Sequence, residues 1–141
     1  MDLKERFEVL RPRDEVLELL CHDETLLGLL PQGETRIVDR GADQRTTETR
    51  YRALGQEGVA RFEFTFLLDG SVRFAKRCDG RVWKRLEGLV SVEERGDECC
   101  EVRIELSGKT KSFVPEFTIK APMEEQIQGM TVALEERLNS S

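Results

Sequence analysis

Two lysines interrupt a sheet face that the sequence otherwise predicts to be apolar. Lys76 and Lys84 alternate with Phe74 and Leu86 in two predicted strands, and a three-residue hairpin would place the lysines directly opposite each other. Two facing ammonium groups repel each other and lose hydration on burial, so they could bind a ligand carboxylate or phosphate at a cavity mouth. The alternative is that both side chains lie along apolar surface with their ends in water.

Hydroxyl groups are predicted on the same face of the sheet. Thr47, Thr49 and Tyr51 alternate in one strand, and a four-residue loop at residues 55–58 would align Tyr51 with Phe62. An aromatic wall with a few hydroxyls suits an amphipathic small molecule. A filled core whose hydroxyls are satisfied internally is the alternative.

Few residues are suited to acid–base chemistry. The chain has one histidine, His22, which excludes histidine-rich metal centres and is predicted at an exposed helix end. Asp39 is the strand carboxylate predicted to face inward, beside Thr35 and Ile37, although its position near a turn also suits a solvated or capping residue. We therefore predict no catalytic residue, no metal site and no cofactor.

The four cysteines are Cys21, Cys78, Cys99 and Cys100, and they contain no C-x-x-C pair. Neighbouring residues on a strand point to opposite faces, so Cys99 and Cys100 are poorly placed to bind one metal ion. We expect reduced, mostly buried thiols rather than a metal centre or a redox sensor.

Hydrophobic residues recur with a period of two along the middle of the chain, between glycine-containing turns. This pattern predicts six strands in consecutive hairpins, at residues 35–40, 46–54, 59–68, 72–78, 82–93 and 98–106. The turns at Asp69-Gly70, Asp79-Gly80 and Gly96-Asp97 should have an odd number of residues, most simply three with a left-handed glycine, because the inward positions are all even. Trp83 then faces outward, unless a bulge shifts the register there.

Helical patterns flank these strands. A first strand at residues 3–10 precedes a helix that opens at Pro12 and a short helix at residues 24–30, capped by Asp23. Residues 123–141 form a long closing helix with one apolar stripe, made of Met123, Ile127, Met130, Leu134 and Leu138. The order predicts an α+β fold in which a curved seven-stranded antiparallel sheet wraps around the closing helix, often leaving a cavity.

Composition narrows the class of protein. The 141 residues fit a single domain, and 22 basic against 28 acidic residues give a net charge of −6. This balance opposes nonspecific binding to nucleic acid or anionic lipid, although it is compatible with a local basic patch. The amino-terminal residues lack an apolar signal segment and no apolar run is long enough to span a bilayer, so we expect a cytoplasmic protein.

The order of elements resembles the helix-grip fold of the START-like superfamily, also called SRPBCC, which includes birch pollen allergens and polyketide cyclases. The resemblance covers residues 1–141, and its most specific parts are residues 7–16, 19–26 and 30–34. These parts look like the opening of bacterial relatives of an accessory protein of carbon monoxide dehydrogenase, although Gln32 separates Pro31 from Gly33. The resemblance implies a cavity for lipids, sterols, polyketides or other apolar molecules.

Three functions are compatible with this sequence. The first is noncatalytic binding of a hydrophobic or amphipathic small molecule; the second is a cyclase or aromatase that uses Tyr51, Asp39 or His22. The third is an accessory protein with a protein partner or a second copy, which an outward Trp83 would favour. For the first, we predict ligand contacts from Tyr51, Phe62, Phe64, Phe74, Lys76, Lys84, Met123, Ile127 and Met130.

Overall fold

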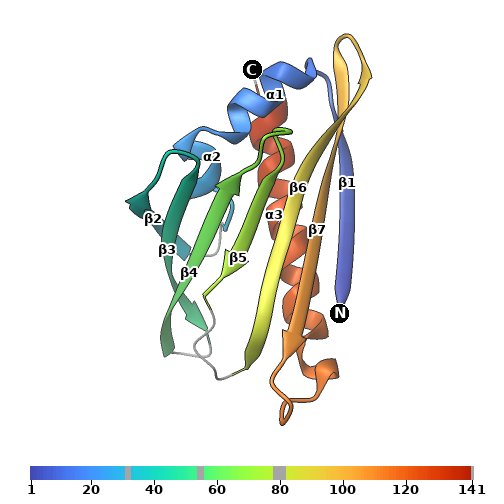
Figure 1. Cartoon of the computed structure of the whole chain (residues 1–141). Helices are drawn as coiled ribbons and strands as arrows, with labels where there is room; N and C mark the ends of the chain where they lie inside the picture. Colours follow the sequence, from blue (N-terminus) through green and yellow to red (C-terminus); the bar gives the residue numbers. More distant parts are fainter. Residues whose placement is uncertain (31–32, 54–55, 78–81, 141) are drawn as a thin grey trace.

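The period-two segments form one seven-stranded antiparallel sheet in the computed structural model (Figure 1). Its strands are β1 (Asp2–Val9), β2 (Gly33–Arg40), β3 (Gln44–Ala53), β4 (Gln56–Phe66), β5 (Val72–Lys76), β6 (Trp83–Gly96) and β7 (Cys99–Thr110). The spatial order β1-β7-β6-β5-β4-β3-β2 makes β2 to β7 a continuous meander, and β1 extends it beside β7. The predicted sheet is confirmed.

The structure describes residues 1–30, 33–53, 56–77 and 82–140, without the side chains of Arg52, Ala53 and Gln56. Several predicted features lie outside the described residues. They are the Pro31-Gln32 segment, the loop residues Leu54 and Gly55, Cys78, and the Asp79-Gly80 turn.

Two short helices follow β1, and a long helix ends the chain. They are α1 (Arg13–Leu20), α2 (Asp23–Leu27) and α3 (Lys120–Asn139), which follows a 3-10 helix, η1 (Glu116–Ile119). Helix α2 was expected to end three residues later and to be capped by Asp23, whereas the residue at the N-cap is His22. Asp23 instead pairs with Arg40 of β2, which fixes α2 beside the outermost strand.

The apolar stripe of α3 is buried as predicted. Met123, Ile127, Met130, Leu134 and Leu138 are each at most 3% exposed. They belong to one core cluster with the inward side chains of the sheet, and α3 packs mainly against β1 and β7. Figure 1 shows α3 running behind the sheet, from the η1 end to the end occupied by α1. The closing helix is therefore the centre of the core.

Glycines on the inner face make room for aromatic rings from neighbouring strands. A Cβ on Gly58 would lie 2.4 Å from Cζ of Tyr51, and a Cβ on Gly88 would lie 2.2 Å from Cζ of Phe74. Tyr51 is directly opposite Gly58, and Phe74 is directly opposite Gly88. An aromatic ring can lie over a cross-strand glycine because no side chain fills that place.

These pairs change two predicted registers. Tyr51 was expected opposite Phe62, but the β3–β4 loop is shorter than expected and Phe62 is opposite Thr47. Val72 is opposite Val90 and Phe74 is opposite Gly88, so β5 and β6 are shifted by two residues from the expected alignment. Lys76 and Lys84 are consequently not directly opposed, although the predicted inward face is unchanged.

A bulge at Lys84 explains why Trp83 departs from the predicted pattern. The β6–β7 register shifts between Trp83 and Arg85, so Trp83 turns to the inner face and packs against the core. A Cβ on Gly108 would lie 2.8 Å from its ring and 2.9 Å from Sδ of Met123. The expected outward Trp83 is wrong, and the alternative of a local bulge is confirmed.

The β4–β5 turn has the predicted form. The N–H of Leu67 donates to the carbonyl of Ser71 at 2.8 Å, which leaves a three-residue loop from Leu68 to Gly70. Gly70 has φ of 89°, a left-handed conformation that disfavours side chains larger than hydrogen.

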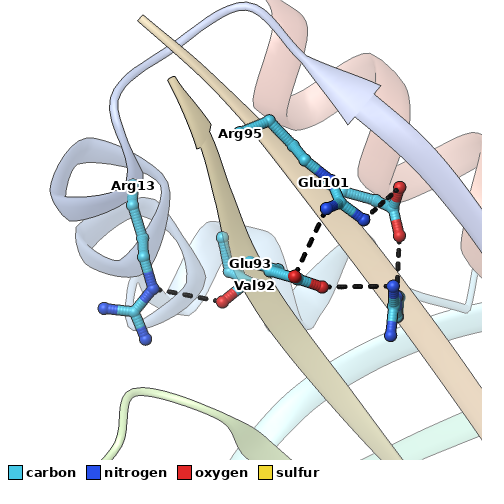
Figure 2. A network of polar contacts seen from close by, with 6 residues as sticks. Arg13, Val92, Glu93, Arg95 and Glu101 are labelled. Carbon is cyan, nitrogen blue, oxygen red and sulfur yellow. Dashed lines mark hydrogen bonds and ion pairs between the residues drawn. The ribbon is translucent and has the colours of Figure 1, made fainter. Parts of the chain in front are cut away.

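Charged side chains cover the outer face of the sheet. Arg95 pairs with Glu93 at 3.3 Å and with Glu101 at 3.2 Å (Figure 2). Arg13 lies at the start of α1, and its Nε donates to the carbonyl of Val92 at 3.1 Å, which ties that helix to β6 (Figure 2). The outer charges are therefore largely engaged with one another or with the backbone.

We predict that Gly88→Ala destabilises the protein by about 1–3 kcal/mol, because the new methyl group overlaps the Phe74 ring and lies 2.5 Å from the carbonyl oxygen of Glu105. Urea unfolding would measure the change. Gly96→Ala is the matched control, because a Cβ there has nothing within 4 Å. Equal stability of the two variants would contradict the role given to Gly88.

A second prediction concerns Glu48 of β3, a buried carboxylate that accepts hydrogen bonds from Arg36 at 2.9 Å and Arg61 at 3.0 Å. These hydrogen bonds lower the pKa of Glu48 below its ordinary 4.5. The carboxylate therefore stabilises the fold above about pH 4.5, and this contribution disappears as pH falls through the lowered folded-state pKa.

Glu48→Gln should reduce the free energy of unfolding at neutral pH, and the difference from wild type should shrink on acidification. Urea unfolding from about pH 7 to about pH 3 measures both effects. Glu94→Gln on the exposed end of β6 is the control. A Glu48→Gln penalty that stays constant across this range would contradict the assignment.

Candidate binding cavity

A cavity of about 290 Å³ lies between the sheet and the helices, towards the end of the sheet where α3 begins. Strands β2 to β5 form one wall, α3 forms the facing wall, and the segment after α2 closes one side. The lining residues are Leu29, Leu30, Gly33, Thr49, Tyr51, Ala60, Phe62, Lys76, Pro122, Glu125, Gln126 and Gly129.

Small residues on both walls leave this space open. Ala60 of β4 faces Gly129 of α3 across the cavity, and Gly33 begins the edge strand beside them. Helix α3 packs mainly against β1 and β7, at the opposite edge of the sheet from β2, so β3 and β4 receive less cover from it. The cavity therefore follows from where α3 is anchored and from the short side chains facing its uncovered part.

Helix α2 completes the enclosure because α3 holds it in place. Arg137 of α3 donates from Nε to Oγ1 of Thr25 at 3.2 Å and lies 3.6 Å from the carboxylate of Glu24. Thr25 in turn donates to the carbonyl of Leu19 at 2.6 Å. These contacts position Leu29 and Leu30, which follow α2 and line the cavity.

The cavity has few polar groups. The Thr49 hydroxyl is already bonded to Thr35 at 2.8 Å, whereas Nε2 of Gln126 is buried and has no hydrogen-bond partner among the described residues. Leaving a buried amide N–H unpaired is costly, and a ligand acceptor would remove that cost. Lys76 supplies positive charge from the sheet wall, and the exposed Glu125 lies on the opposite wall.

The predicted contact residues divide into three groups. Tyr51, Phe62 and Lys76 line the cavity. The second group is fully packed in the core and consists of Phe64, Phe74, Met123, Ile127 and Met130. Lys84 is exposed at the bulge of β6 and is not a lining residue. Their role in ligand binding remains a prediction.

Both alternatives for the interior are realised in different places. The rings of Phe62, Phe64 and Phe74 pack with centroids 6.1 to 6.5 Å apart, so the middle of the interior is filled. The empty volume remains at one end of this cluster, with Phe62 as the ring that borders it.

Sequence reasoning missed most of the helix wall and the small residues. Pro122, Gln126 and Gly129 recur every three or four positions along α3, directly beside the apolar stripe. That spacing is a usable signal, because a small or polar flank next to a buried stripe indicates incomplete packing. Ala60 was also on the inward parity of β4, but its small size gave it no weight as a core residue.

The acid–base candidates lie outside the cavity. His22 is exposed, with Nδ1 at 3.4 Å from Nη2 of Arg137, which agrees with the expected position at a helix end. Asp39 is exposed because the β2 register shifts between Ile37 and Asp39, and its carboxylate accepts from the Arg40 N–H at 2.9 Å. The expected inward Asp39 is therefore wrong, and the capping alternative is confirmed.

The described cysteines are free thiols in different settings. Cys21 is exposed, which contradicts the expectation of mostly buried thiols, whereas Cys100 is buried. Cys99 donates from Sγ to Glu8 at 2.8 Å, and this carboxylate raises the pKa of the thiol to about 11. Within the described ranges no group of three or more histidine, cysteine or acidic side chains is arranged to hold a metal ion.

Two larger depressions lie on the outside of the molecule. One, of about 510 Å³, crosses the outer sheet face around Leu67, Leu89 and Ser107. The other, of about 790 Å³, runs between Gly28 and the side of α3 that carries Val132. Neither lies between the sheet and the helices, so the 290 Å³ cavity is the enclosed candidate.

Comparison with solved structures identifies the fold. A START superfamily protein from Mycobacterium smegmatis superposes with a TM-score of 0.74 at 17% identity, covering 97% of this chain and 96% of that one. The Zhui aromatase/cyclase from Streptomyces sp. R1128 gives 0.75 at 12% identity, covering 98% and 90%. A STAR-related lipid transfer protein fragment from Xanthomonas axonopodis gives 0.66 at 14% identity, covering 97% and 85%.

No protein-family model and no curated protein sequence matches this chain. None of the helices in the described ranges combines the length and apolar character required to cross a membrane. The structural matches extend over nearly the whole chain, and they agree with the meander, the two short helices and the closing helix. The chain has the helix-grip fold of START-like proteins.

Proposed function

We propose that this protein binds a compact hydrophobic or amphipathic molecule in the cavity between β2–β5 and α3, without catalysing a reaction. The observation that carries the proposal is the buried Nε2 of Gln126, which lines an otherwise largely apolar space and lacks a partner among the described residues. A preformed apolar pocket with a few directed polar groups is the usual form of a small-molecule site.

The polar groups indicate the kind of ligand. Gln126 offers an N–H donor from the helix wall and Lys76 offers an ammonium group from the sheet wall. A carbonyl, carboxylate or similar acceptor on the ligand would interact with these donors, and its apolar part would pack on Phe62, Leu29 and Ala60. Glu125 is exposed and can keep its carboxylate in water.

The size of the cavity limits the ligand. Its volume of about 290 Å³ is at the lower end of the range for small-molecule sites, about 300–1,000 Å³. Because Phe64, Phe74 and Met130 fill the space beyond it, a long acyl chain would require the core to open. We therefore favour a ligand of about one or two rings over a membrane lipid.

The fold is shared with proteins named as aromatase/cyclases and as a lipid transfer protein, which supports a small-molecule function without choosing between binding and catalysis. A cyclase role would have to depend on Tyr51, because Asp39 and His22 are not lining residues. The accessory-protein alternative depended on an outward Trp83, and Trp83 faces the core.

Filling the cavity should abolish binding. We predict that Ala60→Phe weakens binding of the uncharged fluorophore N-phenyl-1-naphthylamine at least about tenfold, because the new ring would occupy the space between β4 and α3. A fluorescence titration measures the affinity. Val59→Phe is the matched control, since Val59 is the next residue along β4 and is exposed. Unchanged affinity in a folded Ala60→Phe variant would refute the assigned cavity.

Lys76 should contribute to affinity through its charge. We predict that Lys76→Gln weakens binding of 1-anilinonaphthalene-8-sulfonate about five- to tenfold while N-phenyl-1-naphthylamine, which lacks the sulfonate, binds as before. The exposed Lys84→Gln variant controls for net charge. An equal loss for both fluorophores, or the same loss in Lys84→Gln, would contradict a specific role for Lys76.

A further inference from the structure

Two phenylalanines are exposed in the segment that joins β7 to α3. Phe113 is 74% exposed and Phe117 is 79% exposed, more than any other aromatic side chain that the structure describes. Large apolar side chains are normally buried, so two such rings in one short connection indicate a surface that contacts something. We call residues 109–120 the connecting segment.

The connecting segment is held in this exposed arrangement by its own contacts. The N–H of Lys111 donates to the carbonyl of Val82 at 2.9 Å, and Oγ1 of Thr110 donates to the carbonyl of Val114 at 2.9 Å. Ile119 is 2% exposed and anchors the other end in the core. The two rings therefore project from a fixed support.

The charge of the connecting segment opposes that of the whole chain. The protein has a net charge of −6, yet this segment contains Lys109, Lys111 and Lys120 against one acid, Glu116. Glu116 faces the amino group of Met1 at 3.4 Å. Within the described ranges, no carboxylate is within ion-pair distance of the three lysines, and the exposed Lys84 at the β6 bulge lies beside the same end of β7.

Projecting aromatic rings beside these lysines match the chemistry of an anionic bilayer surface. The rings can enter the boundary between headgroups and acyl chains, and the lysines are attracted to acidic headgroups. A segment of this composition on an otherwise acidic protein would bind lipid locally and orient the molecule. A protein partner would explain the rings but not the accompanying positive charge.

We propose that the connecting segment docks this protein on anionic membranes through Phe113 and Phe117. The cavity lies at the same end of α3, because Pro122 is a lining residue and follows Lys120 by two positions. Docking through this segment would therefore place the cavity close to the lipid. Membrane docking itself does not depend on the proposed ligand binding.

Vesicle co-sedimentation of the full chain tests this proposal. The probes are phosphatidylcholine vesicles with about 30% phosphatidylserine, and vesicles of phosphatidylcholine alone, at about 0.1 M and about 0.5 M salt. We expect binding to the anionic vesicles at low salt, and at least about tenfold weaker binding for Phe113→Ser/Phe117→Ser. A second variant, Lys109→Gln/Lys111→Gln/Lys120→Gln, should lose the dependence on phosphatidylserine and on salt.

Leu68→Ser is the matched control, because Leu68 is a fully exposed apolar residue in the β4–β5 turn, at the opposite end of the molecule (Figure 1). It should bind vesicles like wild type. The proposal is overturned if wild type does not bind anionic vesicles, or if the double phenylalanine variant binds them equally well. It is also overturned if that variant instead abolishes self-association of wild type, which would assign the rings to a second copy.

The two proposals fail separately. The double phenylalanine variant should keep its affinity for N-phenyl-1-naphthylamine, and Ala60→Phe should keep its affinity for anionic vesicles. Loss of fluorophore binding with intact vesicle binding would therefore remove only the ligand proposal, and the reverse result would remove only membrane docking.

Discussion

Burial of the α3 stripe is the constraint on which the rest of this structure depends. A helix with an apolar face must be covered, and here one sheet provides the cover by presenting its inner face to all five stripe residues. The glycines opposite Tyr51 and Phe74, and the one beneath Trp83, let large rings lie close to the sheet surface. The same packing leaves the β2–β4 side less covered, since α3 is anchored at β1 and β7.

The candidate cavity is a consequence of this asymmetric cover. Helix α2 closes part of the gap, and it is held by the contacts of Arg137 with Thr25 and Glu24. What remains is bordered by Ala60 and Gly129, whose short side chains do not fill it. The charged groups on the outer face are largely satisfied by ion pairs, whereas Nε2 of Gln126 in the cavity has no partner in the described part of the chain. This contrast separates the structural charges from a group that can bind a ligand.

The sequence allowed the architecture to be predicted, because hydrophobic periodicity and glycine turns are local signals. It did not determine the registers of β3–β4 and β5–β6, which depend on turn lengths and on which ring lies over Gly58 or Gly88. The bulge at Lys84 turned Trp83 inward, and the bulge before Asp39 placed that carboxylate in water. Neither bulge has a marker in the hydrophobic pattern.

The candidate site was less predictable than the fold for a related reason. Aromatic and long apolar residues indicate where a core is filled, so Phe64, Phe74 and Met130 were chosen and are packed. A cavity instead occurs where residues are too small to meet, and Ala60 and Gly129 are inconspicuous in a hydrophobic pattern. Tyr51, Phe62 and Lys76 were identified because parity placed them on the correct face, near the end where packing is incomplete.

The most direct test of the account is an amide NMR titration of the protein with N-phenyl-1-naphthylamine, which reports where a small apolar molecule binds. We expect the largest chemical-shift changes at Thr49, Ala60, Gln126 and Gly129, on the two facing walls of the cavity. Changes centred on Leu89 and Ser107, or on Val132 and Ala133, would place the molecule in one of the outer depressions and contradict the account.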